Sequence, residues 1–356
     1  MNQLISFLII SLVFFEYTFG TLVEKSNLQE VTLLIRLLYR EIVYGIILLF
    51  IFSKYKDKLF SYNKVLAIFA TFYLVTGFFV EASVNHLVLV IPSLILMHYA
   101  FFEFKYHQSR ISTTLNVVFI LNAIMIIMQF LGVSEMVYYH QNFTEDLSSL
   151  ASFLQTSGYL PNHQHRPHGI FPNSIYLTLF VILYYGHLIL SQNNRKIIYI
   201  ISGLIFPLIG STTIVLLLSA SLFFMRINKK ILYLLVPSLV TFMLIYSIFP
   251  LFFDMNYNFE TFLVSLDVRI DTSKQNSFFT SNLAVSMTFL GVLFIYLVYA
   301  FFTKFINSKN SFISYNLFLL FILLLPLAIH PIFLDARYGF LCGMVASFFT
   351  RKKIPN

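Results

Sequence analysis

The sequence predicts an all-α integral membrane protein with about twelve transmembrane segments in a single domain, residues 1–356. Of its 356 residues, 58% are hydrophobic and only 11% are charged, and the mean hydropathy is +0.82. A soluble protein of this composition would have too few charged groups for its surface, whereas each helical crossing of a bilayer needs about 20 apolar residues. The apolar segments are continuous and do not alternate with polar residues, which favours helices over strands.

Apolar runs follow one another along the whole chain. They cover about residues 4–22, 31–53, 65–81, 86–103, 111–131, 170–190, 197–225, 231–251, 283–302, 312–329 and 332–350. The first run has no basic segment before it and further runs follow, so we expect a retained helix and not a cleaved signal peptide. The one cysteine, Cys342, lies inside the last run, which excludes a disulfide framework and a cysteine-based zinc site.

The basic linkers between the runs predict the side of the membrane that each faces. Sixteen of the 23 Lys and Arg residues lie in such linkers: Lys54, Lys56, Lys58, Lys64, Lys105, Arg110, Arg195, Lys196, Arg226, Lys229, Lys230, Lys304, Lys309, Arg351, Lys352 and Lys353. By the positive-inside rule these linkers and both termini face the cytoplasm. Two longer loops, about 132–169 and 252–282, then face the outside. We interpret the net charge of +8 as a consequence of this topology and not as a nucleic-acid-binding surface, so we expect no nucleic acid as a partner.

The run 197–225 has basic linkers at both ends but is too short for two full crossings. Two short helices that meet near Gly210–Ser211–Thr212–Thr213 would return the chain to its starting side and would make twelve segments. Broken helices occur within a bilayer where their backbone lines a protein-enclosed cavity. A single tilted helix, with one linker wrongly assigned, is the alternative.

The most unusual polar residues stand where the first long loop enters the run 170–190. The pattern Arg166-x-x-Gly169-x-Phe171-Pro172-Asn173, leading into a span, resembles the signature of the O-antigen polymerase and ligase family (Wzy type). The second long loop ends in Gln275–Asn276–Ser277, before a helix with Gly291, and this resembles the family's second polar segment. Gly210–Ser211–Thr212 lies where the family has a small-residue break. The second loop lacks the histidine expected of ligases, so the resemblance favours a polymerase.

The resemblance implies a reaction and a location. The reaction is glycosyl transfer from a polyprenyl-diphosphate-linked oligosaccharide, which joins repeat units at the outer face of the bacterial cytoplasmic membrane. No cofactor is expected, and a protein that regulates chain length would be a further partner besides the lipid bilayer. A flippase for lipid-linked sugars and an O-antigen ligase are the alternatives. Transporters often have internal repeats, and no clear repeat relates the two halves of this chain.

Fixed positive charge near the outer leaflet would stabilise the departing diphosphate, and the planar fork of arginine can hold two phosphate oxygens. Seven cations fall outside the cytoplasmic linkers, and five of them are arginines: Lys25, Arg36, Arg40, Arg166, Arg269, Lys274 and Arg337. We expect catalytic roles for Arg166, Arg269 and His168. We expect substrate-binding roles for Arg36, Arg40, Gly169, Asn173, Asn276 and Arg337.

Each of these roles has a plainer alternative. Arg36 and Arg40 share one helix face, and they could instead extend to the membrane surface or pair with an acid. Arg337 and Asp335 could instead be a structural pair. His163, His165 and His168 could be read as metal ligands, but no nearby acid completes a convincing set, so we expect no metal. The same histidines could be solvated loop residues or could contact hydroxyl or phosphate groups.

Overall fold

The computed structural model describes residues 2–14, 29–59, 64–71, 84–131, 167–171, 174–191, 195–209, 212–225, 229–245, 311–329 and 336–350. All regular structure in these residues is helical, and no strand occurs among them. The prediction of an all-α chain is therefore confirmed. The predicted span 283–302 and the second long loop, 252–282, lie outside the described residues, as does residue range 132–166 of the first long loop.

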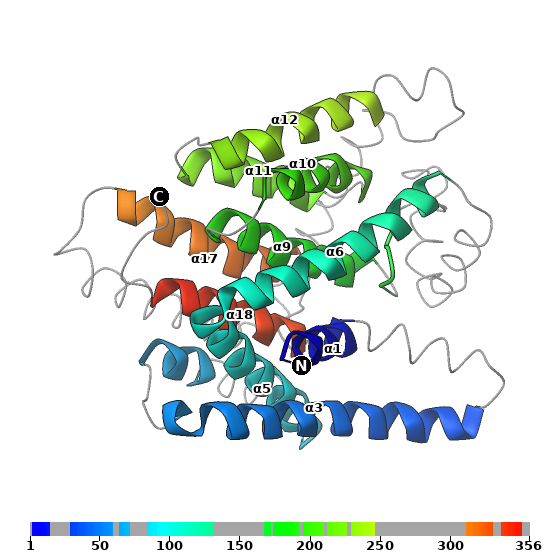
Figure 1. The fold of residues 1–356 in the computed structure, drawn as a ribbon, viewed down its shortest axis with the longest axis vertical. Helices are drawn as coiled ribbons and strands as arrows, with labels where there is room; N and C mark the ends of the chain where they lie inside the picture. The colour runs from blue at the N-terminus through cyan, green and yellow to red at the C-terminus, as the bar shows by residue number, and fades with distance from the viewer. Residues whose placement is uncertain are drawn as a thin grey trace, which may run out of the picture.

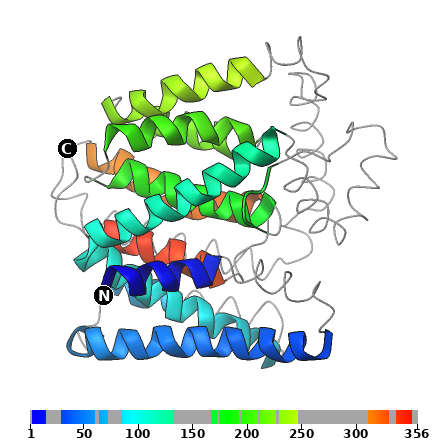
Figure 2. The ribbon, with the colours of Figure 1, turned by 45° about the vertical axis from the view of Figure 1, so that its right-hand side comes forward.

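The helices form one bundle in which most axes run in roughly the same direction (Figures 1 and 2). Their bounds are α1 (Asn2–Phe14), α3 (Gln29–Leu59), α5 (Val84–Tyr106), α6 (Gln108–Phe130), α9 (Ser174–Leu190), α10 (Lys196–Ile205), the 3-10 helix η3 (Phe206–Ile209), α11 (Thr212–Phe224), α12 (Lys229–Met243), α17 (Ser311–Ile329) and α18 (Ala336–Phe349). Residues 64–71 are also helical. Eight of the eleven predicted runs thus contain one described α-helix each, and the run 197–225 contains two. The run 65–81 is described over its first part.

The centre of the bundle is α18, whose residues from Arg337 to Phe349 are all buried. It packs closely on α5 because two glycines face that helix. A Cβ atom added at Gly339 would lie 2.1 Å from the Ser93 carbonyl oxygen, and one at Gly343 would lie 2.2 Å from the Met97 carbonyl oxygen. Small residues four apart allow such close packing of helices. The two contacts follow the same order along both helices, Gly339 with Ser93 and then Gly343 with Met97, so α5 and α18 are parallel.

Side-chain contacts fix the directions of the other helices. On α9, Tyr184 OH donates to Asn116 Oδ1 of α6 at 2.8 Å, and His187 Nε2 lies 3.1 Å from Ser112 Oγ, so α6 and α9 are antiparallel. The His187 ring lies 5.6 Å from that of Phe104, which places the end of α9 beside the end of α5.

We call this end of the bundle the basic end, since Lys54, Lys105, Arg110, Lys196 and Lys230 lie there. We call the opposite end the signature end, since Phe14, Gly169, Phe171 and Arg337 lie there. In Figure 2, α1 begins and α3 ends on the same side of the bundle.

The run 197–225 is divided as predicted. Helix α10 and η3 end at Ile209, and α11 begins at Thr212, so the single-helix alternative is wrong. The Lys230 ammonium group at the start of α12 donates to the Ser191 carbonyl at 3.1 Å, and the Lys196 ammonium lies 5.7 Å from the centre of the Tyr233 ring. Both basic linkers therefore lie at the basic end, and the chain returns there through α11.

The lengths of the helices do not by themselves give twelve crossings. Among the described residues, α6 is the one helix that is long and apolar enough to cross a membrane alone, with 23 residues and a mean hydropathy of 2.1. Shorter apolar helices cover Leu177–Leu190, Lys196–Ile209, Thr213–Phe224, Tyr315–Pro326 and Ala336–Phe349.

Candidate functional site

The part of the signature that the structure describes, residues 167–171, is bound to α6 through its backbone. We call it the signature segment. Gln129 Oε1 accepts hydrogen bonds from the backbone N–H groups of His168 (3.0 Å) and Gly169 (2.9 Å), and Gln129 Nε2 donates to the Gly169 carbonyl at 2.9 Å. One amide side chain thus satisfies three backbone groups of a segment that is nearly 40 residues away in sequence.

A second amide of α6 holds the next residue. Asn122 Oδ1 accepts from the backbone N–H of Ile170 at 2.9 Å. Asn122 and Gln129 are seven residues apart, so they lie on one face of α6, two turns from each other. Both side chains are buried, which strengthens these bonds and makes their loss costly.

Gly169 is required at its position for two reasons. Its φ is +64°, in the left-handed region that residues with a Cβ atom rarely adopt. A Cβ atom there would also lie 1.8 Å from Asn122 Oδ1. The backbone at Gly169 therefore has a left-handed conformation and lies in close contact with α6. Its role in substrate binding stays a prediction.

An aromatic side chain anchors the segment to two further helices and, through one of them, to a third. Phe171 is fully buried, and its ring centre lies 6.5 Å from that of Phe14 in α1 and 5.5 Å from that of Phe180 in α9. The Phe14 ring in turn lies 5.7 Å from that of Phe340 in α18. The signature segment is therefore part of the packed core at this end, although the chain there is not helical.

Two predicted site residues are buried at the signature end. His168 is 1% exposed, so the interpretation of this histidine as a solvated loop residue is wrong. Arg337, the second residue of α18, is 3% exposed and stands two residues before the tightly packed Gly339. Both residues therefore lie within the packed helices at this end of the bundle.

The remaining predicted residues are placed only in part. Arg36 and Arg40 lie in α3, which the structure describes as a continuous helix, but their side chains lie outside the described residues. Along α3, Arg40 is about 21 Å from Lys54, on the side away from the basic end, at 1.5 Å per residue. Arg166, Asn173, Arg269 and Asn276 lie outside the described residues, so their predicted roles stay predictions. In the described part of the chain, no three His, Cys, Asp or Glu side chains gather as a metal site would require.

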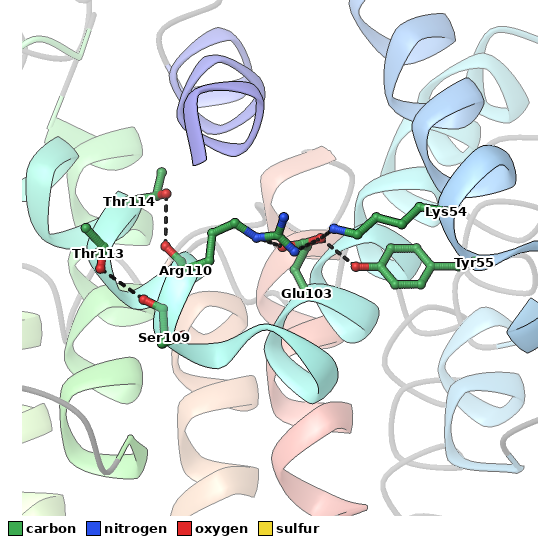
Figure 3. Close-up of polar contacts among 7 residues, drawn as sticks. All are labelled: Lys54, Tyr55, Glu103, Ser109, Arg110, Thr113 and Thr114. Carbon is green, nitrogen blue, oxygen red and sulfur yellow. Dashed lines mark hydrogen bonds and ion pairs between the residues drawn. The ribbon is translucent and has the colours of Figure 1, made fainter. Parts of the chain in front are cut away.

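The basic end contains a buried charged cluster that the sequence did not predict (Figure 3). Glu103 of α5 is fully buried, and its Oε1 atom accepts from Lys54 Nζ at 3.0 Å and from the Tyr55 hydroxyl at 2.5 Å. Arg110 of α6 approaches both carboxylate oxygens, with Nη2 at 3.3 Å from Oε1 and Nε at 3.2 Å from Oε2. We call these four residues the Glu103 centre.

The Glu103 centre ties α3, α5 and α6 together. Lys54 and Arg110 were predicted only as topology signals, yet both are also structural partners of one carboxylate. A signal for this existed in the sequence, because Glu103 is an acid at the end of an apolar run and Arg110 follows seven residues later. A carboxylate at such a position must be paired, since an unpaired buried charge costs several kcal/mol.

Burial and charge alter the proton affinities of nearby groups outside the predicted spans. Burial, together with the hydrogen bond to Glu103, raises the pKa of the Tyr55 hydroxyl well above its usual range. Burial lowers the pKa of Lys54, although Glu103 opposes this shift. The pKa of His107 is lowered by burial and by the positive charges of Lys54 and Arg110. Tyr55 therefore stays protonated, and His107 favours its neutral form.

A scan against protein-family models and searches of curated proteins and of solved structures find no match to this chain.

Proposed function

We propose that this chain is an integral membrane glycosyltransferase that polymerises polyprenyl-diphosphate-linked oligosaccharide repeat units. The reaction takes place at the outer face of a bacterial cytoplasmic membrane. The chain has about twelve membrane segments, and both of its termini are in the cytoplasm. Arg166, Arg269 and His168 act in catalysis, and Arg36, Arg40, Gly169, Asn173, Asn276 and Arg337 bind the substrate.

The membrane topology is supported by the distribution of charge. Where the structure describes them, the linkers that the positive-inside rule assigns to the cytoplasm lie at one end of the bundle, with contacts such as Lys230 with Ser191 and Arg110 with Glu103. The outward faces of α3 and α12 carry exposed apolar side chains, which include Ile42, Leu49 and Val236. In water such surfaces would associate, whereas lipid chains solvate them.

The observation that carries the assignment is the fixed conformation of the signature segment. It is neither helix nor strand, yet two buried amides hold its backbone, Gly169 takes a positive φ there, and the buried Arg337 lies at the same end. Catalysis by fixed positive charge needs such preorganisation, because charges that need not move stabilise a transition state more effectively. Arg166 precedes this held segment by one residue, so its backbone leads directly into it.

Deletion of the gene in its natural host tests the proposal and separates the alternatives. Loss of a polymerase should leave single repeat units on the surface lipid, which gel electrophoresis of the surface glycan would show. Loss of a flippase should remove surface repeat units altogether, and loss of a ligase should leave long chains on the polyprenyl carrier. Long surface glycan in the deletion strain would rule out the polymerase.

The proposed topology has a separate test. Cysteines placed at Ser149 and Thr272, in a Cys342→Ala background, should react with a membrane-impermeant maleimide added to intact cells. Protection of either cysteine from the reagent would overturn the assignment of the long loops to the outside.

A further inference from the structure

Two neighbouring helices, α9 and α11, both run towards the basic end and begin at nearly the same depth. The Tyr185 hydroxyl of α9 lies 2.6 Å from Ser221 Oγ of α11, so the two helices are side by side. Tyr185 is eleven residues after the first residue of α9, and Ser221 is nine residues after the first residue of α11. At 1.5 Å per residue, the helices begin about 16.5 Å and 13.5 Å from this contact. Their starts therefore differ in depth by only about 3 Å.

The start of a helix favours an anion. Its first backbone N–H groups have no partner within the helix, and the helix dipole adds partial positive charge there. Two parallel helices that begin at nearly the same depth add their effects. Helix α9 begins three residues after Phe171, the last residue of the signature segment. The positive ends of α9 and α11 therefore lie at the signature end.

A buried hydroxyl at the start of α11 indicates a ligand more specifically. Thr213 is the second residue of α11 and is fully buried. Among the described residues, no group forms a hydrogen bond with its Oγ1 atom. The Cα–Cβ bond of a helical residue is tilted towards the helix N-terminus, so this side chain leans towards the first turn of α11. A buried hydroxyl without a partner costs free energy, which the oxygen of a bound anion would offset.

Other buried hydroxyl groups in helices of this chain do have partners. Ser202, Ser238 and Thr114 each donate to the backbone carbonyl four residues earlier, at 2.7 Å, 2.8 Å and 3.1 Å. This local bond is the usual one for serine and threonine within a helix. Thr213 does not make it, although the residue four positions earlier, Ile209, is described. Its hydroxyl is therefore available to a ligand at the helix start.

We propose that Thr213 and the first turn of α11, beside the start of α9, bind the diphosphate of the polyprenyl-linked substrate. Thr213 Oγ1 donates to a phosphate oxygen, and backbone N–H groups at the helix start donate to others. These donors are neutral and complement the arginines proposed for the same group. The inference rests on the substrate of the proposed function and not on the polymerisation step.

The test measures binding of radiolabelled farnesyl diphosphate to the purified full-length chain in detergent. A hydrogen bond from Thr213 to a charged oxygen should contribute about tenfold to the affinity, or about 1.4 kcal/mol. Thr213→Val removes the hydroxyl at nearly constant shape and should bind about tenfold more weakly. Its unfolding temperature without ligand should equal or exceed that of the parent, because the hydroxyl has no partner among the described residues to lose. Thr213→Ser should bind like the parent.

The controls separate binding from structure and the lipid from free diphosphate. Thr114→Val removes a buried hydroxyl that donates to the Arg110 carbonyl at the basic end. This variant should unfold at a lower temperature and bind farnesyl diphosphate like the parent. Farnesol lacks the diphosphate and inorganic diphosphate lacks the prenyl chain, so both should compete poorly with farnesyl diphosphate.

Four results would overturn the proposal. They are no binding of farnesyl diphosphate by the parent, parent-like binding by Thr213→Val, a lower unfolding temperature of ligand-free Thr213→Val, or displacement by either competitor as effectively as by unlabelled farnesyl diphosphate. Each of them leaves the polymerase proposal standing, because the deletion strain tests that proposal separately by the length of the surface glycan.

Discussion

The two ends of the bundle are held together by different chemistry. At the signature end, two neutral amides of α6 hold a non-helical segment through its backbone groups. At the basic end, a buried carboxylate joins three helices through the charges of Lys54 and Arg110. The neutral amides fix the conformation of the segment without placing a negative charge beside it, and we propose that this suits a site for an anionic substrate. At the basic end, the Glu103 carboxylate neutralises Lys54 and Arg110 and thereby holds three helices together.

The largest effect should follow the loss of the acid at the basic end. Glu103→Gln keeps the shape of the side chain but leaves Lys54 and Arg110 without their carboxylate. Removing one partner of a buried ion pair costs about 3–5 kcal/mol, so the temperature of unfolding in detergent should fall sharply. The control Asp57→Asn removes an exposed acid at the same end and should change stability by less than about 0.5 kcal/mol. Equal stabilities of the two variants would show that the Glu103 centre does not hold the helices.

At the signature end, Gly169→Ala should have the next largest effect. The added Cβ would both force a positive φ on alanine and overlap Asn122 Oδ1, and we expect a cost of about 3 kcal/mol with loss of polymerisation. Gly45→Ala is the matched control, because a Cβ at Gly45 meets nothing within 4 Å. The control should be stable and active. An active Gly169→Ala variant would mean that the observed conformation of this segment is not needed for the reaction.

The two amides of α6 should differ in importance. Gln129→Met leaves three backbone hydrogen-bonding groups unsatisfied and should cost about 2 kcal/mol, whereas Asn122→Leu leaves one and should cost about 1 kcal/mol. Glycan chain length should decrease in the same order. Gln129→Glu keeps the acceptor but loses the donor to Gly169, so it should lie between parent and Gln129→Met. Thermal unfolding and gel analysis of the glycan would check this ranking, and the reverse ranking would contradict the clamp.

The smallest effect concerns pH at the basic end. Burial and the charges of Lys54 and Arg110 lower the pKa of His107 in the folded chain. The unfolded chain then binds a proton more readily, so stability should fall as pH decreases below the unfolded pKa of about 6.5 and should level off below the folded pKa. His107→Gln should flatten this part of the profile. Identical pH profiles of unfolding temperature for parent and His107→Gln would show that His107 does not cause this pH dependence.

The sequence predicted the helices and their grouping better than the contacts that hold them. Long apolar runs and lysine-rich linkers are local signals, and the break before Thr212 follows from the length of its run. The roles of Asn122 and Gln129 could not be predicted, because each is an ordinary polar residue within an apolar run and its partners are 39 or more residues away. The same holds for Glu103 and Lys54, which are 49 residues apart.

The candidate site was predicted to a smaller extent. The sequence marked residues 166–173 by their unusual composition, and the structure shows that residues 167–171 form a turn held against α6. The burial of His168 and Arg337 is a result of tertiary packing, which no local pattern encodes.

The measurement that tests the central claim most directly is polymerisation by the purified chain with a polyprenyl-diphosphate-linked repeat unit as substrate. Arg166→Lys and Arg269→Lys keep the charge but lose the two-pronged contact with diphosphate, so turnover should fall at least about tenfold, or about 1.4 kcal/mol. Unfolding temperature and membrane level should stay normal. Arg110→Lys, at the basic end, should instead lower stability and leave turnover per folded molecule unchanged. If Arg166→Lys and Arg269→Lys both polymerise like the parent, these arginines do not hold the diphosphate and the claim is wrong.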